Sequence, residues 1–146
     1  LLKPSAQGGW SIAQCLHHLN SYGDFYLPHI EGVLDKHKDL PAREYFKSGW
    51  LGGYFTRMMD HRTGKKYATF KQHIPPSVLD ARATVAAFIQ QQETLLAYLS
   101  KAKTADLTSL RVPISISPLV RLKLGDVFQF VIMHNERHIM QALRNV

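Results

Sequence analysis

Two histidines near the end of the chain have the type and spacing for metal chemistry. The stretch HNERHIMQ places His134 and His138 four residues apart inside an apolar run. At about 100° per residue, both imidazoles fall on one stripe of a helix with Val127, Phe130 and Val131. Such a pair can hold one metal ion from a single helical face. Without a metal, two buried imidazoles would compete for few hydrogen-bond partners.

The first helix supplies a third inward-facing histidine. On a wheel for residues 11–37, His18 lies at the edge of the apolar face, whereas His17 points nearly opposite, toward solvent. The expected metal ligands are therefore His18, His134 and His138. The bland alternative, in which they are hydrogen-bonded core residues, stays open at this point. The histidines expected at the surface or in loops are His29, His37, His61 and His73.

Three neutral imidazoles leave at least one coordination position open, which is typical of catalytic or ligand-binding sites rather than structural ones. All-nitrogen ligation suits zinc, nickel, copper or iron, and we expect a divalent transition metal, zinc or nickel. Cys15 precedes His18 by three residues and lies about 60° away on the wheel. It faces the main core, so we expect a buried thiol rather than a fourth ligand.

Four helices are expected to position these side chains. They cover residues 11–37, 43–61, 77–102 and 124–145. The segment 103–123 connects the third and fourth helices. Apolar residues alternate over 112–116, which allows a short extended piece there. No segment predicts a convincing sheet, so the expected fold class is all-α.

Local signals mark the ends and weak points of these helices. Ser11 and Gln14 have the spacing of a capping box at the start of the first helix. Pro28 should remove one backbone hydrogen bond and kink that helix. Ser77, after two prolines, is the expected N-cap of the third helix. Glycines that weaken the second helix are Gly49, Gly52 and Gly53.

Composition and charge limit the classes of function. With 45% hydrophobic and 20% charged residues, the 146 residues fit one globular domain, 1–146. No apolar run approaches the roughly 18 residues of a membrane span, and the single cysteine fits a reducing, cytoplasmic compartment. The net charge of +7 suits an anionic small molecule. Nucleic acid is not an expected partner, because no helix-turn-helix, zinc-finger or basic-stripe signature is present.

Two motifs resemble those of the DinB-like superfamily. The stretch WSIAQCLHHL, residues 10–19, resembles the family signature W-S-x-x-E-x-x-x-H-L, and HNERHIMQ resembles its closing H-x-x-x-H-x-x-Q. The resemblance spans nearly the whole chain. It implies that His18, His134 and His138 are the metal ligands. It also implies a four-helix bundle with a long crossover connection, here residues 38–76.

The chain departs from the family pattern in two places. Gln14 stands where the family usually has glutamate. Family members also carry a whole helix before the Trp-Ser motif, and here that helix is expected either to precede Leu1 in the native protein or to be replaced. Residues 43–61 or a partner chain would then take its place. We therefore expect an apolar groove along the first and last helices, and a homodimer is one way to cover it.

The resemblance implies a candidate function, since some DinB-like proteins are thiol S-transferases. These enzymes couple a low-molecular-weight thiol, such as bacillithiol or mycothiol, to an electrophile. In this chain Arg137 and Gln141 are expected to support the ligands or to orient the thiol co-substrate. One alternative is a non-catalytic metal- or ligand-binding module. Another is a metal-dependent hydrolase, disfavoured because Glu136 points away from the histidine stripe.

Overall fold

The chain folds mostly into helices. The computed structural model describes residues 1–6, 8–36 and 45–146. The four α-helices are α1 (Ile12–Lys36), α2 (Trp50–Met59), α3 (Ala81–Ala102) and α4 (Leu124–Leu143). Two short 3₁₀ helices follow α2, namely η1 (His61–Thr63) and η2 (Lys71–His73). A small antiparallel sheet joins β1 (Arg111–Ile114) to β2 (Ser117–Lys123).

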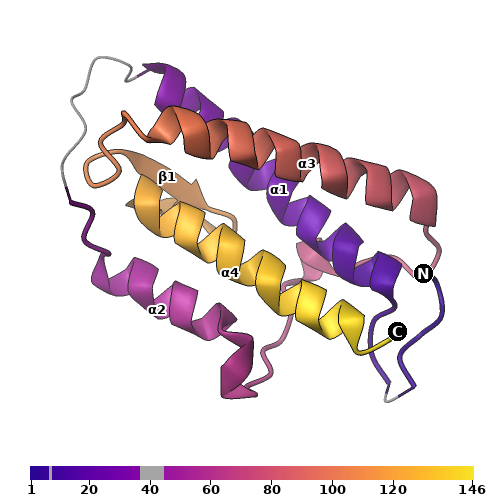
Figure 1. Cartoon of the computed structure of the whole chain (residues 1–146). Coiled ribbons are helices and arrows are strands. Elements are labelled where there is room, and N and C mark those ends of the chain that lie inside the picture. The colour runs from indigo at the N-terminus through magenta and orange to yellow at the C-terminus, as the bar shows by residue number, and fades with distance from the viewer. Residues whose placement is uncertain (7, 37–44) are drawn as a thin grey trace.

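Helix α1 forms the centre of the arrangement. It packs against α3 on one side and α4 on the other, and α2 packs against α4 (Figure 1). Helices α1 and α4 run in opposite directions, so the start of α1 lies beside the end of α4, where both chain termini lie (Figure 1). Fully buried apolar side chains from α1, β1 and α4 form the core, among them Ile30, Val112, Leu124 and Val127. Burying each contributes about 1.5–3 kcal/mol.

The helix predictions hold best where periodicity is regular. Helices α1 and α4 match their predicted spans to within two residues at each end. The capping box is confirmed, because Gln14 N donates to Ser11 Oγ at 3.2 Å and Ser11 N donates to Gln14 Oε1 at 3.0 Å. The predicted cap of α3 at Ser77 is wrong. Asp80 caps α3 instead, since its side chain accepts from the backbone N–H groups of the second and third residues after it.

Helix α2 is shorter than predicted because its start is used for a different contact. Residues 45–49 are not helical, and residues 43 and 44 of the predicted helix lie outside the described residues. Asp126, at 1% exposure, accepts hydrogen bonds from Ser48 Oγ and from Gly49 N, the latter at 3.0 Å. A Cβ at Gly52 would lie 2.2 Å from Asp126 Cγ. Glycine has a low helix propensity, but at position 52 its missing side chain allows α2 to pack closely against Asp126 of α4.

A short hairpin is added to the mostly helical chain that the all-α expectation describes. The extended piece predicted within 112–116 is strand β1, and it pairs with a second strand that the sequence did not indicate. Val112 and Leu122 are cross-strand partners, and both are buried. The sheet therefore contributes buried side chains to the core, in addition to those of α1 and α4. The chain is mostly helical with a small two-stranded sheet, and the expected four-helix bundle is not confirmed.

Exposed apolar side chains lie along α3 and α4. On α1 none of the large apolar residues is exposed, but Ile12, Leu16, Phe25 and Val33 are only half-buried. On the other two helices the exposed large apolar residues are Ile89, Leu96, Ile132, Ile139, Met140 and Leu143. None of the helices in the described part of the chain combines the length and apolar character that crossing a bilayer requires.

Candidate metal centre

Three histidines converge where the start of α1 meets the end of α4. His18, His134 and His138 each offer a ring nitrogen, and these three atoms lie within 4.8 Å of one another. The side chains are buried, with exposures of 2%, 4% and 8% in that order. The structure thus brings together all three residues that the sequence selected.

Hydrogen bonds fix the ring tautomers of two of these histidines. His18 Nδ1 lies 2.7 Å from the carbonyl oxygen of His73, and His138 Nδ1 lies 2.9 Å from Gln141 Oε1. Both oxygens can only accept, so each Nδ1 carries the proton and each Nε2 keeps its lone pair. Outer hydrogen bonds of this kind orient metal-ligating histidines.

The Nε2 atoms of His18 and His134 provide a test of whether a metal fits. They lie 3.1 Å apart. With the proton of His134 on Nε2 this contact is a hydrogen bond to His18 Nε2, whereas with that proton on Nδ1 two lone pairs face each other and need a cation between them. The donor set therefore fits a divalent transition metal held by three imidazoles, with room for further ligands.

Burial keeps the three imidazoles neutral. Loss of hydration lowers the pKa of His18 to about 4 and that of His138 to about 3. The pKa of His134 also falls well below its ordinary value, first because of burial and then because of its two histidine neighbours. Neutral imidazole is the form that binds a metal, so the site is ready for one at neutral pH.

These pKa values predict that acid destabilises the metal-free protein. Below pH 6.5 the unfolded chain takes up protons on these histidines while His18 resists protonation to about pH 4 and His138 to about pH 3. The unfolded state then binds more protons, so the free energy of unfolding falls as pH falls, by about 1.4 kcal/mol per pH unit for each histidine. Urea unfolding of the metal-free protein at pH 7 and pH 5 measures this.

The control for this pH experiment is His29→Gln, which removes an exposed imidazole and should leave the pH dependence unchanged. His138→Gln should make the dependence shallower, because one buried titrating group is gone. Equal urea midpoints for the unsubstituted protein at pH 7 and pH 5 would contradict the prediction.

His73 is the main site residue that the sequence did not indicate. It was expected at the surface or in a loop, but the side chain is buried at 6% exposure in η2. Its ring stacks on Tyr22 at 3.9 Å between centroids, and its Nδ1 lies 2.9 Å from Ser21 Oγ. These contacts hold the His73 carbonyl against His18.

His17 departs from expectation: it was expected to point toward solvent, but its side chain is half-buried, and its Nδ1 is buried with no hydrogen-bond partner among the described residues. The remaining histidines were expected at the surface or in loops. His29 is exposed. His61 is half-buried in η1 and lies 3.2 Å from the carboxylate of Glu136. His37 lies outside the described residues. Cys15 is buried, and burial raises the pKa of its thiol to about 11, as expected for a core thiol.

Two further side chains border the three histidines. Trp10, which the sequence placed only before the helix start, has its ring 4.8 Å from that of His18 and 5.8 Å from that of His138. Arg137 donates to the backbone oxygens of Met58 and Lys65 and lies 5.6 Å from the ring of Tyr67. It therefore ties the last turn of α2 and the segment that follows it to α4.

Comparison with known proteins supports the resemblance. A family model described as DinB superfamily matches residues 1–142. The chain belongs to the DinB superfamily. No curated protein and no solved structure matches this DinB-superfamily chain.

Gln14 has a contact in this DinB-superfamily protein that a glutamate could not make. Its Nε2 donates to the backbone oxygen of Pro76 at 3.3 Å, while its Oε1 completes the capping box with Ser11. A carboxylate would accept but could not donate to that carbonyl. The substitution therefore helps to hold the connection between η2 and α3 against the start of α1.

The three histidines of this DinB-superfamily site open into a cleft of about 560 Å³. Its walls come from Ser5 and residues 8–10, from α1, from the segment 58–70 and from the end of α4. The basic residues that line it are Lys65, Lys66, Arg137 and Arg144. Among the described residues that line it, none is an aspartate or glutamate. The cleft therefore favours an anionic ligand beside the three imidazoles.

Proposed function

We propose that this DinB-superfamily protein is a metal-dependent enzyme that acts on a small anionic molecule, as a thiol S-transferase does. The observation that carries the proposal is the position of three neutral, oriented imidazoles at the base of a cleft lined by cations. Neutral imidazoles suit a metal, and the cations suit the negative charges of a low-molecular-weight thiol.

Each part of the site has a role in this proposal. His18, His134 and His138 would hold zinc or nickel, which when bound lowers the pKa of a thiol so that thiolate forms at neutral pH. Gln141 acts through His138 by fixing its tautomer. Arg137 holds the segment from Met58 to Lys65 over the cleft and presents positive charge within it.

The hydrolase alternative is the weaker one. A metal-assisted hydrolase would use a nearby carboxylate as general base. Glu136 is exposed and contacts His61, and no carboxylate occurs among the described residues that line the cleft. The non-catalytic binding module is the stronger alternative, because it needs the same metal and the same cations but no turnover.

The test is an activity assay on metal-loaded protein. Bacillithiol, mycothiol and glutathione would be offered with 1-chloro-2,4-dinitrobenzene, and conjugate formation followed by absorbance. Metal-dependent conjugation of an anionic thiol is the expected result. Bound metal without turnover on any thiol would favour the binding module.

The cations predict how substrate affinity should change. The double substitution Lys65→Gln and Lys66→Gln should raise the KM for an anionic thiol about fivefold with kcat little changed, since exposed charges contribute about 0.5 kcal/mol each. Lys103→Gln, exposed and outside the cleft, is the matched control. A KM that responds equally to both changes would count against charge recognition in the cleft.

The proposal extends to assembly and compartment. A homodimer would cover the apolar side chains that stay exposed on α3 and α4. An activity that consumes a reduced thiol belongs in a reducing compartment, so we propose a cytoplasmic protein.

A further inference from the structure

A second cavity lies between the later half of α1 and the hairpin. Its volume is about 880 Å³, and it shares no lining residue with the cleft above the three histidines. His29 lines it from α1, eleven residues after His18, which corresponds to about 16 Å along the helix. The two sites are therefore separate places on the same helix.

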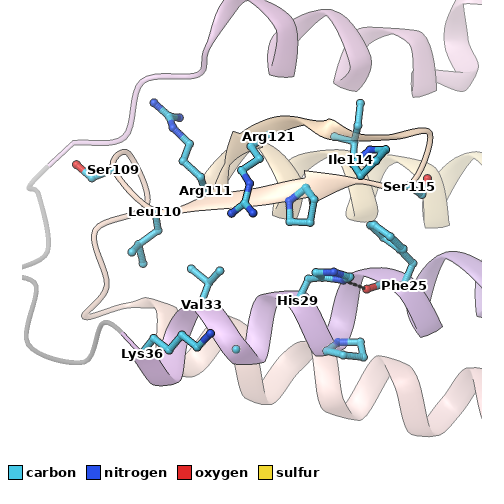
Figure 2. A pocket seen from close by; sticks show the side chains of 14 residues that line it. Phe25, His29, Val33, Lys36, Ser109, Leu110, Arg111, Ile114, Ser115 and Arg121 are labelled. Atoms are coloured by element: carbon cyan, nitrogen blue, oxygen red, sulfur yellow. Dashed lines mark hydrogen bonds between the residues drawn. The ribbon is translucent and has the colours of Figure 1, made fainter.

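The walls of this cavity combine an apolar surface with cations. Phe25 and Val33 of α1 point toward the hairpin, Arg121 points from the hairpin toward α1, and Arg111 points away from α1 at the edge (Figure 2). The apolar residues include Phe25, Val33, Leu110 and Ile114. The cations are Lys36, Arg111 and Arg121, and no aspartate or glutamate occurs among the described residues that line the cavity.

The acidic residues of α1 are directed to a different neighbour. Asp24 accepts a hydrogen bond from Gln91 at 2.7 Å, and Asp35 lies 3.9 Å from Lys101. Both partners belong to α3, on the other side of α1 from the hairpin. Glu31 likewise interacts with Tyr98 of α3. Because these carboxylates of α1 interact with α3, they do not neutralise the lysine and arginine side chains that line the cavity.

The three cations have no carboxylate partner among the described residues. An arginine that faces an apolar space presents planar N–H donors suited to a carboxylate, sulfonate or phosphate group. Cavities of several hundred cubic ångströms with apolar walls and a few polar groups are typical of small-molecule sites.

We propose that this cavity is a second ligand site that binds a small organic anion with an apolar body. Arg121 binds the anionic group, with Lys36 and Arg111 contributing charge at the rim. Phe25 and Val33 on α1 contact the apolar body. The site is independent of the metal centre, because no residue is shared between them.

The first test compares three probes by isothermal titration calorimetry. Octanoate carries both an apolar body and a charge, octanol only the apolar body, and inorganic phosphate only the charge. Octanoate should bind at least about tenfold more tightly than either, because only it uses both the arginine and the apolar wall. Equal affinity for octanoate and octanol, or for octanoate and phosphate, would overturn the proposal.

The second test locates the binding. Arg121→Gln should weaken octanoate about tenfold, the loss expected for one charge-assisted hydrogen bond. Arg82→Gln is the matched control, since Arg82 is exposed at the start of α3 and lines neither cavity. Equal weakening by both substitutions would mean that only overall charge matters and would overturn the site.

A filling substitution completes the test without removing a charge. Gly32 lines the cavity, and a Cβ there would meet nothing within 4 Å. Gly32→Phe should therefore fold normally, as thermal unfolding would check, and should block octanoate. Octanoate binding that survives this change but is lost in the Lys65→Gln, Lys66→Gln protein would place the anion in the metal cleft and overturn the proposal.

Discussion

Replacing His134 with alanine should remove the bound metal. His134 has its ring centroid 5.0 Å from that of His18 and 4.7 Å from that of His138. Its loss leaves two ligands from two different helices. Metal affinity should fall more than about 100-fold, since loss of an outer hydrogen-bond partner alone costs about 10–100-fold.

The measurement is metal content by mass spectrometry on protein purified without a histidine tag. The unsubstituted protein should carry about one transition metal ion per chain, because one cluster of three ligands is present in the described residues. His18→Ala and His138→Ala should lose it as His134→Ala does. His29→Ala, which removes an exposed imidazole from the same helix as His18, should retain it.

Either outcome has a clear consequence for function. If the proposal is right, thiol-transfer activity should disappear together with the metal in His134→Ala. Activity that survived complete loss of metal would contradict the mechanism. No metal in the unsubstituted protein, even after reconstitution, would mean that the histidines are hydrogen-bonded core residues.

The three ligands could be predicted because they lie on regular helices. In α1 and α4 burial follows the helical period, so the wheel separates buried His18 from its half-buried neighbour His17. Two ligands, His134 and His138, are one turn apart on α4, so their spacing in the sequence is enough to place both on the same face of the helix. The sequence signal was therefore strongest where local geometry decides side-chain direction.

The outer contacts of the site could not be predicted in the same way. His73 belongs to a 3₁₀ turn of three residues, which has no periodicity, and it is buried only because η2 packs on α1. The hairpin was hidden for a related reason. Strand β1 alternates and was predicted as an extended piece, but β2 contains Pro118, buries only Leu122 and shifts register against β1 between Pro113 and Ile114, so it shows no clean alternation.

Replacing Gly52 with alanine should destabilise the protein, although alanine is the better helix former by about 1 kcal/mol. The added Cβ would lie 2.2 Å from Asp126 Cγ and 2.4 Å from Asp126 Oδ2. Asp126 cannot simply turn aside, because its two oxygens accept from Ser48 and Gly49. Either α2 moves off α4 or a buried carboxylate loses its partners, and we expect a net loss of about 2 kcal/mol.

Gly53 provides the control within the same helix. A Cβ at Gly53 would meet only Arg57 Nη1 and Ser48 Oγ, each at 3.3 Å and each near the end of a side chain. Gly53→Ala should therefore be neutral or stabilising by up to about 1 kcal/mol through helix propensity. Urea unfolding of the two variants should differ in sign, and equal stabilities would contradict the packing argument.

The Gly52 substitution should also change the site, because α2 leads directly into the cleft wall. Arg137 of α4 holds the carbonyls of Met58 and Lys65, so a shift of α2 strains or breaks those contacts. Gly52→Ala should raise the KM for an anionic thiol while metal content stays at the level of the unsubstituted protein, since the three histidines lie on α1 and α4.

A double-mutant cycle tests the contact between Gly52 and Asp126. Asp126→Ala should lower the free energy of unfolding less in the Gly52→Ala protein than in the unsubstituted protein, because it relieves the clash. A fully additive pair would show that Gly52 and Asp126 act independently, and the contact between α2 and α4 would then not be what positions the cleft wall.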